Sequence, residues 1–534
     1  MPKVRFSAPP YRWLFGGLGF HNSEASMTRL MPAHFRDERV LKTFRELSPT
    51  FSRIYAGFAD WTDSAISAFS DYYHQTFAQS DCTIYAVPGR IPPHETAAER
   101  AAFADAIAER LDTLVHAHDV RLLRYFCITN ELSVGNTYAK LAHDFPAFVD
   151  YHQQLYRAFR QHNLDIGLLA TDTSGISTYW QINWAAAHMD ELTAAYCAHN
   201  YDSLGYAFDD PGYYHALFNA FRGPVQTARR MSKRFILGEF GVHNEREHMR
   251  NTDVMIDDVP AGYGDPRQEA RAALMACVQA LAALNSGVYA AAFWSMCDYP
   301  DPFIPDNGHT PDAEARYETA RFSGFGTSIR YNKNGLFRWS ETGDYSPRAY
   351  LYSYGLMTKF FRKHSRVLAA QTDDPHLICG GVTNPDGSAA ICLSNLYPDP
   401  AEVTVACDFP RAQPFRAYEY LCDQVPENPF GDLQPFTIPD LSDSSDFTRT
   451  LPPYSLTLLT TDYADRTPAA VKCRTADGAL HWDAPDDPSH RYFRIYRGGA
   501  QIASTVAHHW TVAPGADPSE YTVRSVDASG NVGF

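Results

Sequence analysis

Short apolar runs recur between residues 12 and 300, and a polar, amphipathic stretch of helical length follows most of them. Eight such runs occupy residues 13–20, 51–58, 82–87, 122–129, 166–171, 194–199, 235–240 and 288–294. Helix candidates cover residues 97–117, 145–162, 213–231, 267–284 and 350–364. Strands that alternate with helices pair in parallel and are buried on both faces, which explains why the runs are nearly continuous in apolar residues. Eight such units predict an α/β fold that closes into a (β/α)₈ TIM barrel.

After about residue 365 the pattern changes to short strands of alternating polarity, separated by turn signals. The strand-like segments cover residues 376–387, 389–400, 401–409, 415–421 and 451–460. The sequence Asn-Pro-Asp-Gly at the end of the first segment is a typical hairpin turn. This part of the chain therefore predicts an all-β sandwich over residues 365–463.

Residues 466–534 form a third unit with its own strand pattern. Trp482 lies on an early strand, residues 521–527 read YTVRSVD, and an Asp-x-x-Gly-Asn turn begins at Asp527. These features resemble a fibronectin type III module. The predicted order is therefore a catalytic barrel over residues 1–364, a β-sandwich over 365–463, and a small fibronectin type III-like β-sandwich over 466–534.

Composition narrows the choice of partners and of compartment. The chain of 534 residues is 45% hydrophobic, and 46 Lys and Arg against 62 Asp and Glu give a net charge of −16. Nucleic acids and anionic membrane surfaces are poor partners, since both require a concentrated positive field. No run reaches the roughly 18 apolar residues of a membrane span, and the first residues lack the apolar region of a signal peptide. We therefore expect a cytoplasmic protein, or a secreted one if a signal peptide has been removed.

The ten cysteines show neither CxxC pairs nor the density of a disulfide-stapled domain. Several lie inside apolar runs, as in YFCIT and AYCAH. We therefore expect mostly buried free thiols.

The active site of a parallel barrel is built at the carboxyl ends of its strands, so the residues that end each run are the candidates for chemistry. Asn130 and Glu131 end the fourth run, within RYFCITNELSVGN, and Glu239 ends the seventh, within RFILGEFGVHN. Other polar and aromatic residues at strand ends are His21, Asn22, Arg53, His199, Tyr201 and Trp294. Glycoside hydrolysis needs one carboxylic acid to protonate the leaving oxygen and a second carboxylate that faces the anomeric carbon. Glu131 and Glu239 meet these needs, because strands four and seven lie on opposed arcs of the barrel.

An Asn-Glu pair at strand four and a Glu at strand seven resemble the clan A glycoside hydrolases, over roughly residues 12–364. The appended sandwich, which ends in LPPYSLTL, is similar to that of families 39, 30, 51 and 79. The Asn-Glu pair is followed here by Leu-Ser instead of the Pro common in several of these families, so no single family is assigned.

The resemblance implies a role for each candidate residue. Glu131 would be the acid/base and Glu239 the nucleophile. The hydroxyl of Tyr201 would donate to the nucleophile, and Arg53 would hold it from strand two. The remaining substrate contacts would come from Asn130 beside the acid, from Trp294 beneath the sugar, and from His199, His21 and Asn22.

Ordinary structural interpretations stand beside these. Arg53 is also suited to a barrel salt bridge and Trp294 to the upper layer of the core. We expect Asp172, after the fifth run, to cap the next helix, as aspartates in this position often do. No set of His, Cys and carboxylate residues has the spacing of metal ligands, and no glycine-rich phosphate loop follows a strand. The sequence therefore predicts no metal and no cofactor.

Together these observations predict a retaining hydrolase that cleaves a β-type bond in an oligosaccharide or a glycoside. Exo action is favoured because the segments 244–266 and 297–347 are long enough to close one end of a cleft. Two alternatives stay open: an endo-acting polysaccharide hydrolase with the same carboxylates, and a non-catalytic carbohydrate-binding barrel. The oligomeric state and the sugar are left open.

Overall fold

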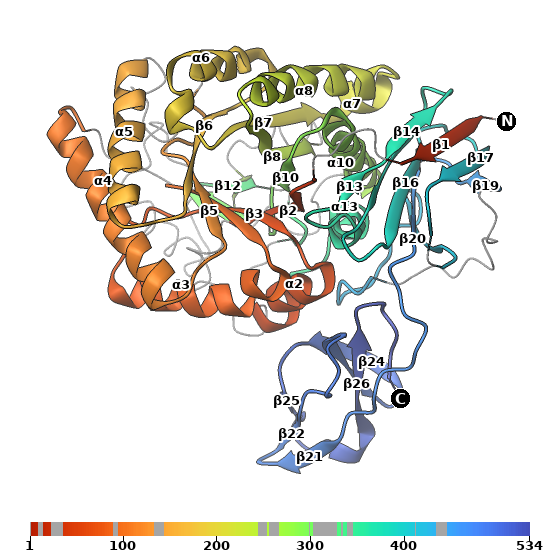
Figure 1. Ribbon diagram of the computed structural model, residues 1–534. Coiled ribbons are helices and arrows are strands. Elements are labelled where there is room, and N and C mark those ends of the chain that lie inside the picture. Colours follow the sequence, from red (N-terminus) through yellow and green to blue (C-terminus); the bar gives the residue numbers. More distant parts are fainter. Residues whose placement is uncertain are drawn as a thin grey trace.

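The computed structural model describes residues 2–8, 14–22, 36–88, 94–132, 144–243, 254–255, 266–297, 299–302, 328–332, 335–338, 345–411, 413–433 and 446–533. Its central element is a closed barrel with the strand order β10-β2-β3-β4-β5-β6-β7-β8, in which neighbouring strands are parallel. The barrel strands are β2 (Gly17–His21), β3 (Phe51–Tyr55), β4 (Thr83–Val87), β5 (Leu123–Phe126), β6 (Gly167–Thr173), β7 (Ala195–Ser203), β8 (Arg234–His243) and β10 (Ala290–Phe293). Each strand overlaps one of the eight apolar runs, so the predicted barrel is confirmed (Figure 1).

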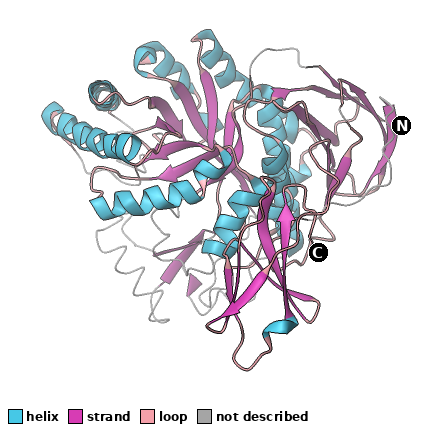
Figure 2. Ribbon diagram, turned by 60° about the horizontal axis from the view of Figure 1, so that its bottom comes forward, coloured by secondary structure: helices cyan, strands magenta, loops and turns pink. Residues whose placement is uncertain are grey.

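Helices surround the barrel, as Figures 1 and 2 show from two directions. They are α2 (Lys42–Leu47), α3 (Asp63–Gln75), α4 (Ala97–Asp112), α5 (Phe145–Gln161), α6 (Trp180–His188), α7 (Leu204–Asp209), α8 (Tyr213–Arg230), α10 (Pro266–Ser286), α12 (Ala349–Tyr352) and α13 (Tyr354–Phe360). Local signals set several of their starts. Thr96 and Glu99 form a capping box at α4, and the side chain of Asp144 accepts a hydrogen bond from the backbone N–H of Ala147 at α5.

Two apolar layers hold the barrel and its helices together. Inward-facing side chains, among them Phe51, Tyr85, Leu169 and Ile236, fill the barrel itself. A larger cluster packs the outward faces of the strands against the helices. The filled interior forces polar groups to the strand ends, where the candidate site lies.

The predicted sandwich is present as two sheets, ordered β14-β1-β17-β19 and β13-β15-β16-β20-β18. Their strands are β1 (Lys3–Ser7), β13 (Arg366–Val367), β14 (Ala369–Thr372), β15 (Leu377–Thr383), β16 (Ala389–Asn395), β17 (Ala401–Asp408), β18 (Arg416–Leu421), β19 (Asp446–Leu451) and β20 (Ser455–Thr460). A small separate sheet joins β9 (Val254–Met255), β11 (Tyr299–Pro302) and β12 (Ser328–Asn332).

One part of the expected barrel range, residues 1–364, belongs elsewhere. Strand β1 pairs in parallel with β17 and antiparallel with β14, and its buried residues Val4 and Phe6 belong to the core of the sandwich. Placing residues 3–7 in the barrel was therefore wrong, because the partners of this strand, Ala369–Thr372 and Thr404–Asp408, lie far along the chain. The other domain boundaries stay a proposal.

The C-terminal unit contains two three-stranded sheets, β21-β22-β25 and β24-β23-β26. Its strands are β21 (Cys473–Ala476), β22 (Ala479–Trp482), β23 (His490–Arg497), β24 (Ala500–Thr505), β25 (His509–Thr511) and β26 (Tyr521–Asp527). Trp482, Phe493 and Ile495 are at its core. The likeness to fibronectin type III stays a prediction.

A buried charge cluster joins this unit to the other two. Lys42 of α2 pairs with Glu46 at 2.7 Å and with Asp432 at 2.8 Å, and Arg494 of β23 pairs with the other oxygen of Asp432 at 2.9 Å. The hydroxyl of Tyr492 donates to Glu46 at 3.4 Å. All five side chains are buried. Figure 1 shows the unit directly beneath α2.

Nine of the ten cysteines are buried and all ten are free, as expected; Cys473 is exposed. Among the helices that the structure describes, none is both long and apolar enough to cross a membrane.

Candidate active site

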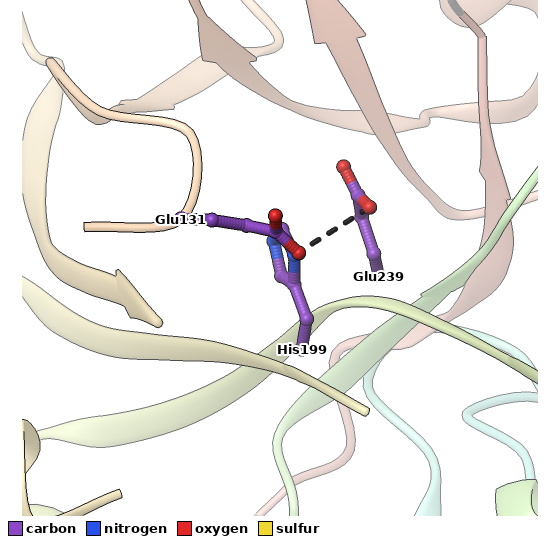
Figure 3. Close-up of side chains that lie close together, drawn as sticks. All are labelled: Glu131, His199 and Glu239. Carbon is purple, nitrogen blue, oxygen red and sulfur yellow. Dashed lines mark hydrogen bonds and ion pairs between the residues drawn. The ribbon is translucent and has the colours of Figure 1, made fainter. Parts of the chain in front are cut away.

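Glu131 and Glu239 face each other at the carboxyl ends of the barrel strands. Glu131 follows β5 and Glu239 lies within β8. One carboxylate oxygen of each, together with a ring nitrogen of His199, forms a group whose atoms all lie within 4.8 Å of one another (Figure 3). The backbone of Glu131 has a φ of 55°, in the left-handed region that only surrounding contacts hold for a residue with a side chain.

Glu239 is held by two donors from other strands. Arg53, on β3, donates Nη1 to Oε1 of Glu239, and Tyr201, on β7, donates its hydroxyl to Oε2 at 2.6 Å. Only 4% of Glu239 is exposed. Burial raises the pKa of Glu239, whereas the positive charges of Arg53 and His199 oppose that rise.

The second guanidinium nitrogen of Arg53 organises the opposite side of the site. Nη2 donates to Oδ1 of Asn130 at 2.7 Å and to Oδ2 of Asp172 at 2.7 Å. Arg53 is fully buried, so each of these charge-assisted bonds lies in a region from which water is excluded. Arg53 thus connects Asn130, which follows β5, with Glu239 on β8.

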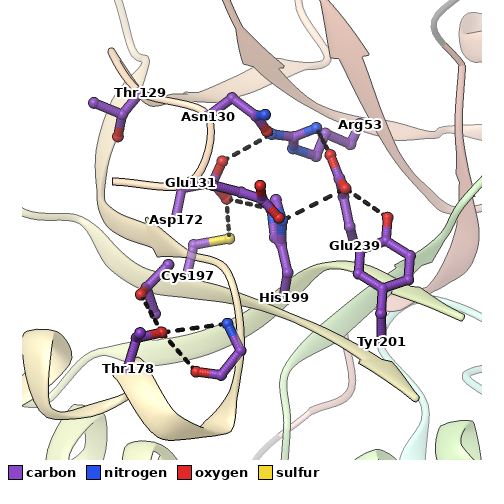
Figure 4. Close-up of polar contacts among 12 residues, drawn as sticks. Arg53, Thr129, Asn130, Glu131, Asp172, Thr178, Cys197, His199, Tyr201 and Glu239 are labelled. Carbon is purple, nitrogen blue, oxygen red and sulfur yellow. Dashed lines mark hydrogen bonds and ion pairs between the residues drawn. The ribbon is translucent and has the colours of Figure 1, made fainter. Parts of the chain in front are cut away.

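His199 lies between the two carboxylates (Figure 4). Its Nε2 is 2.9 Å from Oδ1 of Asp172, and its Nδ1 is 3.1 Å from Oε1 of Glu131. Although burial disfavours a charged ring, the negative charges of Asp172 and Glu239 raise the pKa of His199 to about 10. His199 is therefore an imidazolium at neutral pH, with an N–H on each side.

Asp172 is part of this network and does not cap a helix, so that expectation was wrong. Its oxygens accept from Arg53, from His199 and from the thiol of Cys197 at 3.1 Å. Although burial disfavours its charge, Arg53 and His199 hold the pKa of Asp172 well below its usual range. Gly238 makes room for it, since a Cβ there would come within 2.7 Å of Cys197 Sγ and 3.1 Å of Asp172 Oδ1.

An aromatic cluster lies beside the carboxylates. The ring of His21 is 4.2 Å from that of Trp294 and 4.7 Å from that of Tyr55, and Tyr55 in turn packs 5.1 Å from the guanidinium of Arg53. Burial places the pKa of His21 well below its ordinary value, so its ring is neutral. Among the described residues neither ring nitrogen of His21 has a hydrogen-bond partner.

Asn22 is placed differently from the other candidates. Its amide donates to the hydroxyl of Tyr72 on α3. This contact directs the side chain toward the helical layer, and its sugar contact stays a prediction.

The three atoms contributed by Glu131, His199 and Glu239 are also close enough together to hold a metal ion. A ligating histidine must offer a neutral nitrogen. Asp172 and Glu239 instead keep His199 protonated at neutral pH. The protonated ring of His199 therefore supplies the positive charge between the two carboxylates.

Several solved structures of glycoside hydrolases have a fold similar to that of this chain. The family 30 subfamily 8 xylanase Xyn30A from Clostridium acetobutylicum matches with a TM-score of 0.54 and 12% identity, over 86% of this chain and 99% of that one. The family 51 α-L-arabinofuranosidase AbfB from Bifidobacterium longum matches with a TM-score of 0.56 and 13% identity, over the same shares. An exported protein from Bacteroides fragilis matches at 0.57 and 10% identity, over 86% and 100%.

No protein-family model matches the sequence, and no curated protein sequence does. The resemblance to clan A glycoside hydrolases is confirmed at the level of the fold, with families 30 and 51 among its structural neighbours.

Sequence reasoning missed two members of the site, Asp172 and Tyr55. A signal for Asp172 existed in the sequence GLLATD, since Asp172 directly follows the fifth apolar run as Asn130 directly follows the fourth. Tyr55 follows Arg53 by two residues on β3, and alternation along a strand places both on the same face.

Proposed function

We propose that this protein is a retaining glycoside hydrolase that cleaves a β-type glycosidic bond by double displacement. The main support is the short distance between the two carboxylates: one oxygen of Glu131 lies within 4.8 Å of one oxygen of Glu239. Retaining enzymes keep their carboxyl groups about 5 to 5.5 Å apart, whereas inverting enzymes need about 6.5 to 9.5 Å to admit a water molecule. The separation here supports direct attack by one carboxylate.

In the first step Glu239 attacks the anomeric carbon while Glu131 protonates the departing oxygen. Arg53 and Tyr201 each hold one oxygen of Glu239, so the carboxylate meets the sugar in a fixed orientation. The glycosyl-enzyme ester that forms has lost the negative charge of Glu239, and Glu131 has gained one.

In the second step Glu131 takes a proton from water, which attacks the anomeric carbon from the opposite face and releases Glu239. Two inversions leave the anomeric configuration unchanged. Asn130, fixed by Arg53 beside the acid, is placed to bind the sugar 2-hydroxyl, a contact able to strengthen in the transition state.

Trp294, backed by the rings of His21 and Tyr55, would supply the apolar wall on which the C–H face of a sugar rests. Exo action remains our expectation for the mode of attack. The segments 244–266 and 297–347 that motivated it lie largely outside the described residues.

The proposal is tested with a panel of aryl β-glycosides, following the first product of any that is cleaved by NMR. We expect that product to carry the anomeric configuration of the substrate. An inverted first product would remove Glu239 as nucleophile. Binding of oligosaccharides without turnover of any member of the panel would favour the carbohydrate-binding alternative, and internal cleavage of long chains would favour the endo-acting one.

A further inference from the structure

A cavity of about 580 Å³ lies where the helical layer of the barrel meets the sandwich. Its walls come from α8, from the end of α10, and from the segment of β13, β14 and β15. A second cavity of about 160 Å³ shares Phe218 and Asn285 with the first and continues along α8. We call the two together the junction groove.

The junction groove and the candidate active site lie at opposite ends of the barrel. Asn285 is near the end of α10, shortly before β10 begins, whereas Trp294 directly follows the end of β10. The groove is therefore near the amino ends of the barrel strands, and the carboxylates are at their carboxyl ends. The part of a ligand that occupies the groove is therefore not the part that the carboxylates cleave.

The groove has an aromatic wall and a fixed acceptor. Tyr214 and Phe218, one helical turn apart on α8, stack with ring centroids 6.2 Å apart and an interplanar angle of 24°. The amide of Asn285 donates both to the hydroxyl of Tyr214 and to the carbonyl of Cys379, each at 2.8 Å. Its Oδ1 is thereby held in place as an acceptor, and no donor among the described residues reaches it. Half-buried aromatic faces beside a fixed acceptor suit the C–H face and hydroxyls of a sugar.

The smaller cavity adds positive charge. Arg222 and Arg229 line it and are exposed, in a chain whose net charge is −16. The guanidinium of Arg222 lies 5.5 Å from the centre of the Phe218 ring, and no carboxylate among the described residues pairs with it. Asp374 lines the larger cavity, where its carboxylate accepts hydrogen bonds from the hydroxyl of Tyr397 and from the backbone N–H of His376.

We propose that the junction groove binds an acidic oligosaccharide, with sugar faces on Tyr214 and Phe218 and a uronate carboxylate on Arg222. Guanidinium groups bind carboxylates through paired charge-assisted hydrogen bonds, which a neutral sugar does not offer. This second site goes beyond the proposed function, because it contributes binding and no chemistry. It would keep the enzyme on an acidic polysaccharide while the barrel acts elsewhere on the chain.

The test uses the full chain carrying Glu239→Gln, so that turnover does not consume the ligand. Two probes are titrated calorimetrically: tetragalacturonate and a xylotriose carrying one glucuronosyl branch, each beside its methyl ester. We expect at least one acid to bind, its ester to bind about tenfold more weakly, and Arg222→Gln to weaken the acid by about tenfold. Phe218→Ala should weaken acid and ester alike, whereas Arg230→Gln, an exposed neighbour outside the groove, should change neither.

Any of three results would overturn the proposal. Neither acid binds, or acid and ester bind equally well, or the Arg222→Gln and Arg230→Gln chains bind the acid equally well. Arg222→Gln in the otherwise unaltered chain should leave aryl glycoside turnover as it was. If the unaltered chain turns over no glycoside but binds the acid through Arg222, the proposed hydrolase activity is refuted while the proposed binding site is supported.

Discussion

Nδ1 of His199 lies 3.1 Å from Oε1 of Glu131, the proposed acid/base. The same nitrogen is 3.5 Å from Oε2 of Glu239, so one N–H faces both carboxylates. Their charges alternate during double displacement, since Glu239 is ionised before the glycosyl-enzyme forms and Glu131 is ionised while it persists. A single imidazolium, anchored on Asp172, can therefore stabilise whichever carboxylate is charged without moving the backbone.

This relationship predicts the effect of His199→Gln. The variant keeps a polar side chain but loses the positive charge. Glu131 becomes a poorer proton donor, because the negative charge that it gains on protonating the leaving group no longer has a cation beside it. A lost charge-assisted hydrogen bond is worth about 1.5–3 kcal/mol, and kcat/KM should fall about 10- to 100-fold. Steady-state kinetics on an aryl glycoside measure it. An unchanged kcat/KM would show that the imidazolium plays no part in either step.

Glu131→Ala should discriminate between leaving groups. Departure of an activated nitrophenol needs little protonation, whereas a sugar or methyl leaving group needs the acid, whose removal costs about 10²- to 10⁴-fold. We expect the larger loss of kcat/KM on the poor leaving group. Equal losses on both substrates would assign the acid role to another group.

The charge on His199 also makes folding stability depend on pH. The pKa of His199 is about 10 in the folded chain, against about 6.5 for an unfolded histidine. A raised folded pKa contributes stability that is fully present below about pH 6.5 and is lost as pH rises through about 10. The difference in melting temperature between the unaltered chain and His199→Gln should therefore shrink between pH 6.5 and 10.

The titration of Asp172 does not contribute to the pH dependence over this range. Its lowered pKa contributes stability present above the unfolded value of about 4, which is lost only as pH falls below that value. Between pH 6.5 and 10 it stays ionised in both chains. If the difference in melting temperature between the two chains stays constant from pH 6.5 to 10, His199 is not protonated in the folded chain.

The sequence predicted the barrel and most of the candidate site, because both follow from short-range pattern. Strands buried on two faces are apolar throughout, and Glu131 and Glu239 stand where such runs end. Asp172 was misassigned because helix capping is a local rule, while its partners Arg53 and His199 are brought to it only by closure of the barrel. Strand β1 alternates buried Val4 and Phe6 with outward residues, yet nothing local indicates a partner as distant as β17.

The junction between the C-terminal unit and the barrel predicts a paired effect on stability. Arg494→Met leaves buried Asp432 with Lys42 as its remaining cation, beside the neutral donors Ser504 and Gln501, so the loss of stability should be at most the about 3–5 kcal/mol of a fully uncompensated buried charge. Adding Asp432→Leu removes the excess buried negative charge, while Lys42 keeps its pair with Glu46 and Gln501 keeps its hydrogen bond to Ser504. Denaturant titrations should therefore show the double variant to be more stable than Arg494→Met alone. A double variant no better than the single one would mean that the charge pair contributes little to the junction.

Glu239→Gly should remove hydrolysis and open a space at the face of the sugar from which the nucleophile attacks. Added azide can enter that space and displace an activated leaving group, whose departure does not depend on Glu131. Because only one displacement then occurs, the glycosyl azide should have the inverted anomeric configuration, whereas the product of the unaltered enzyme retains it. Glu239→Gln is the matched control, since its amide fills the space and should allow no rescue. NMR of the two products gives the result: a retained glycosyl azide, or equal rescue of both variants, would exclude Glu239 as the nucleophile and with it the double displacement proposed here.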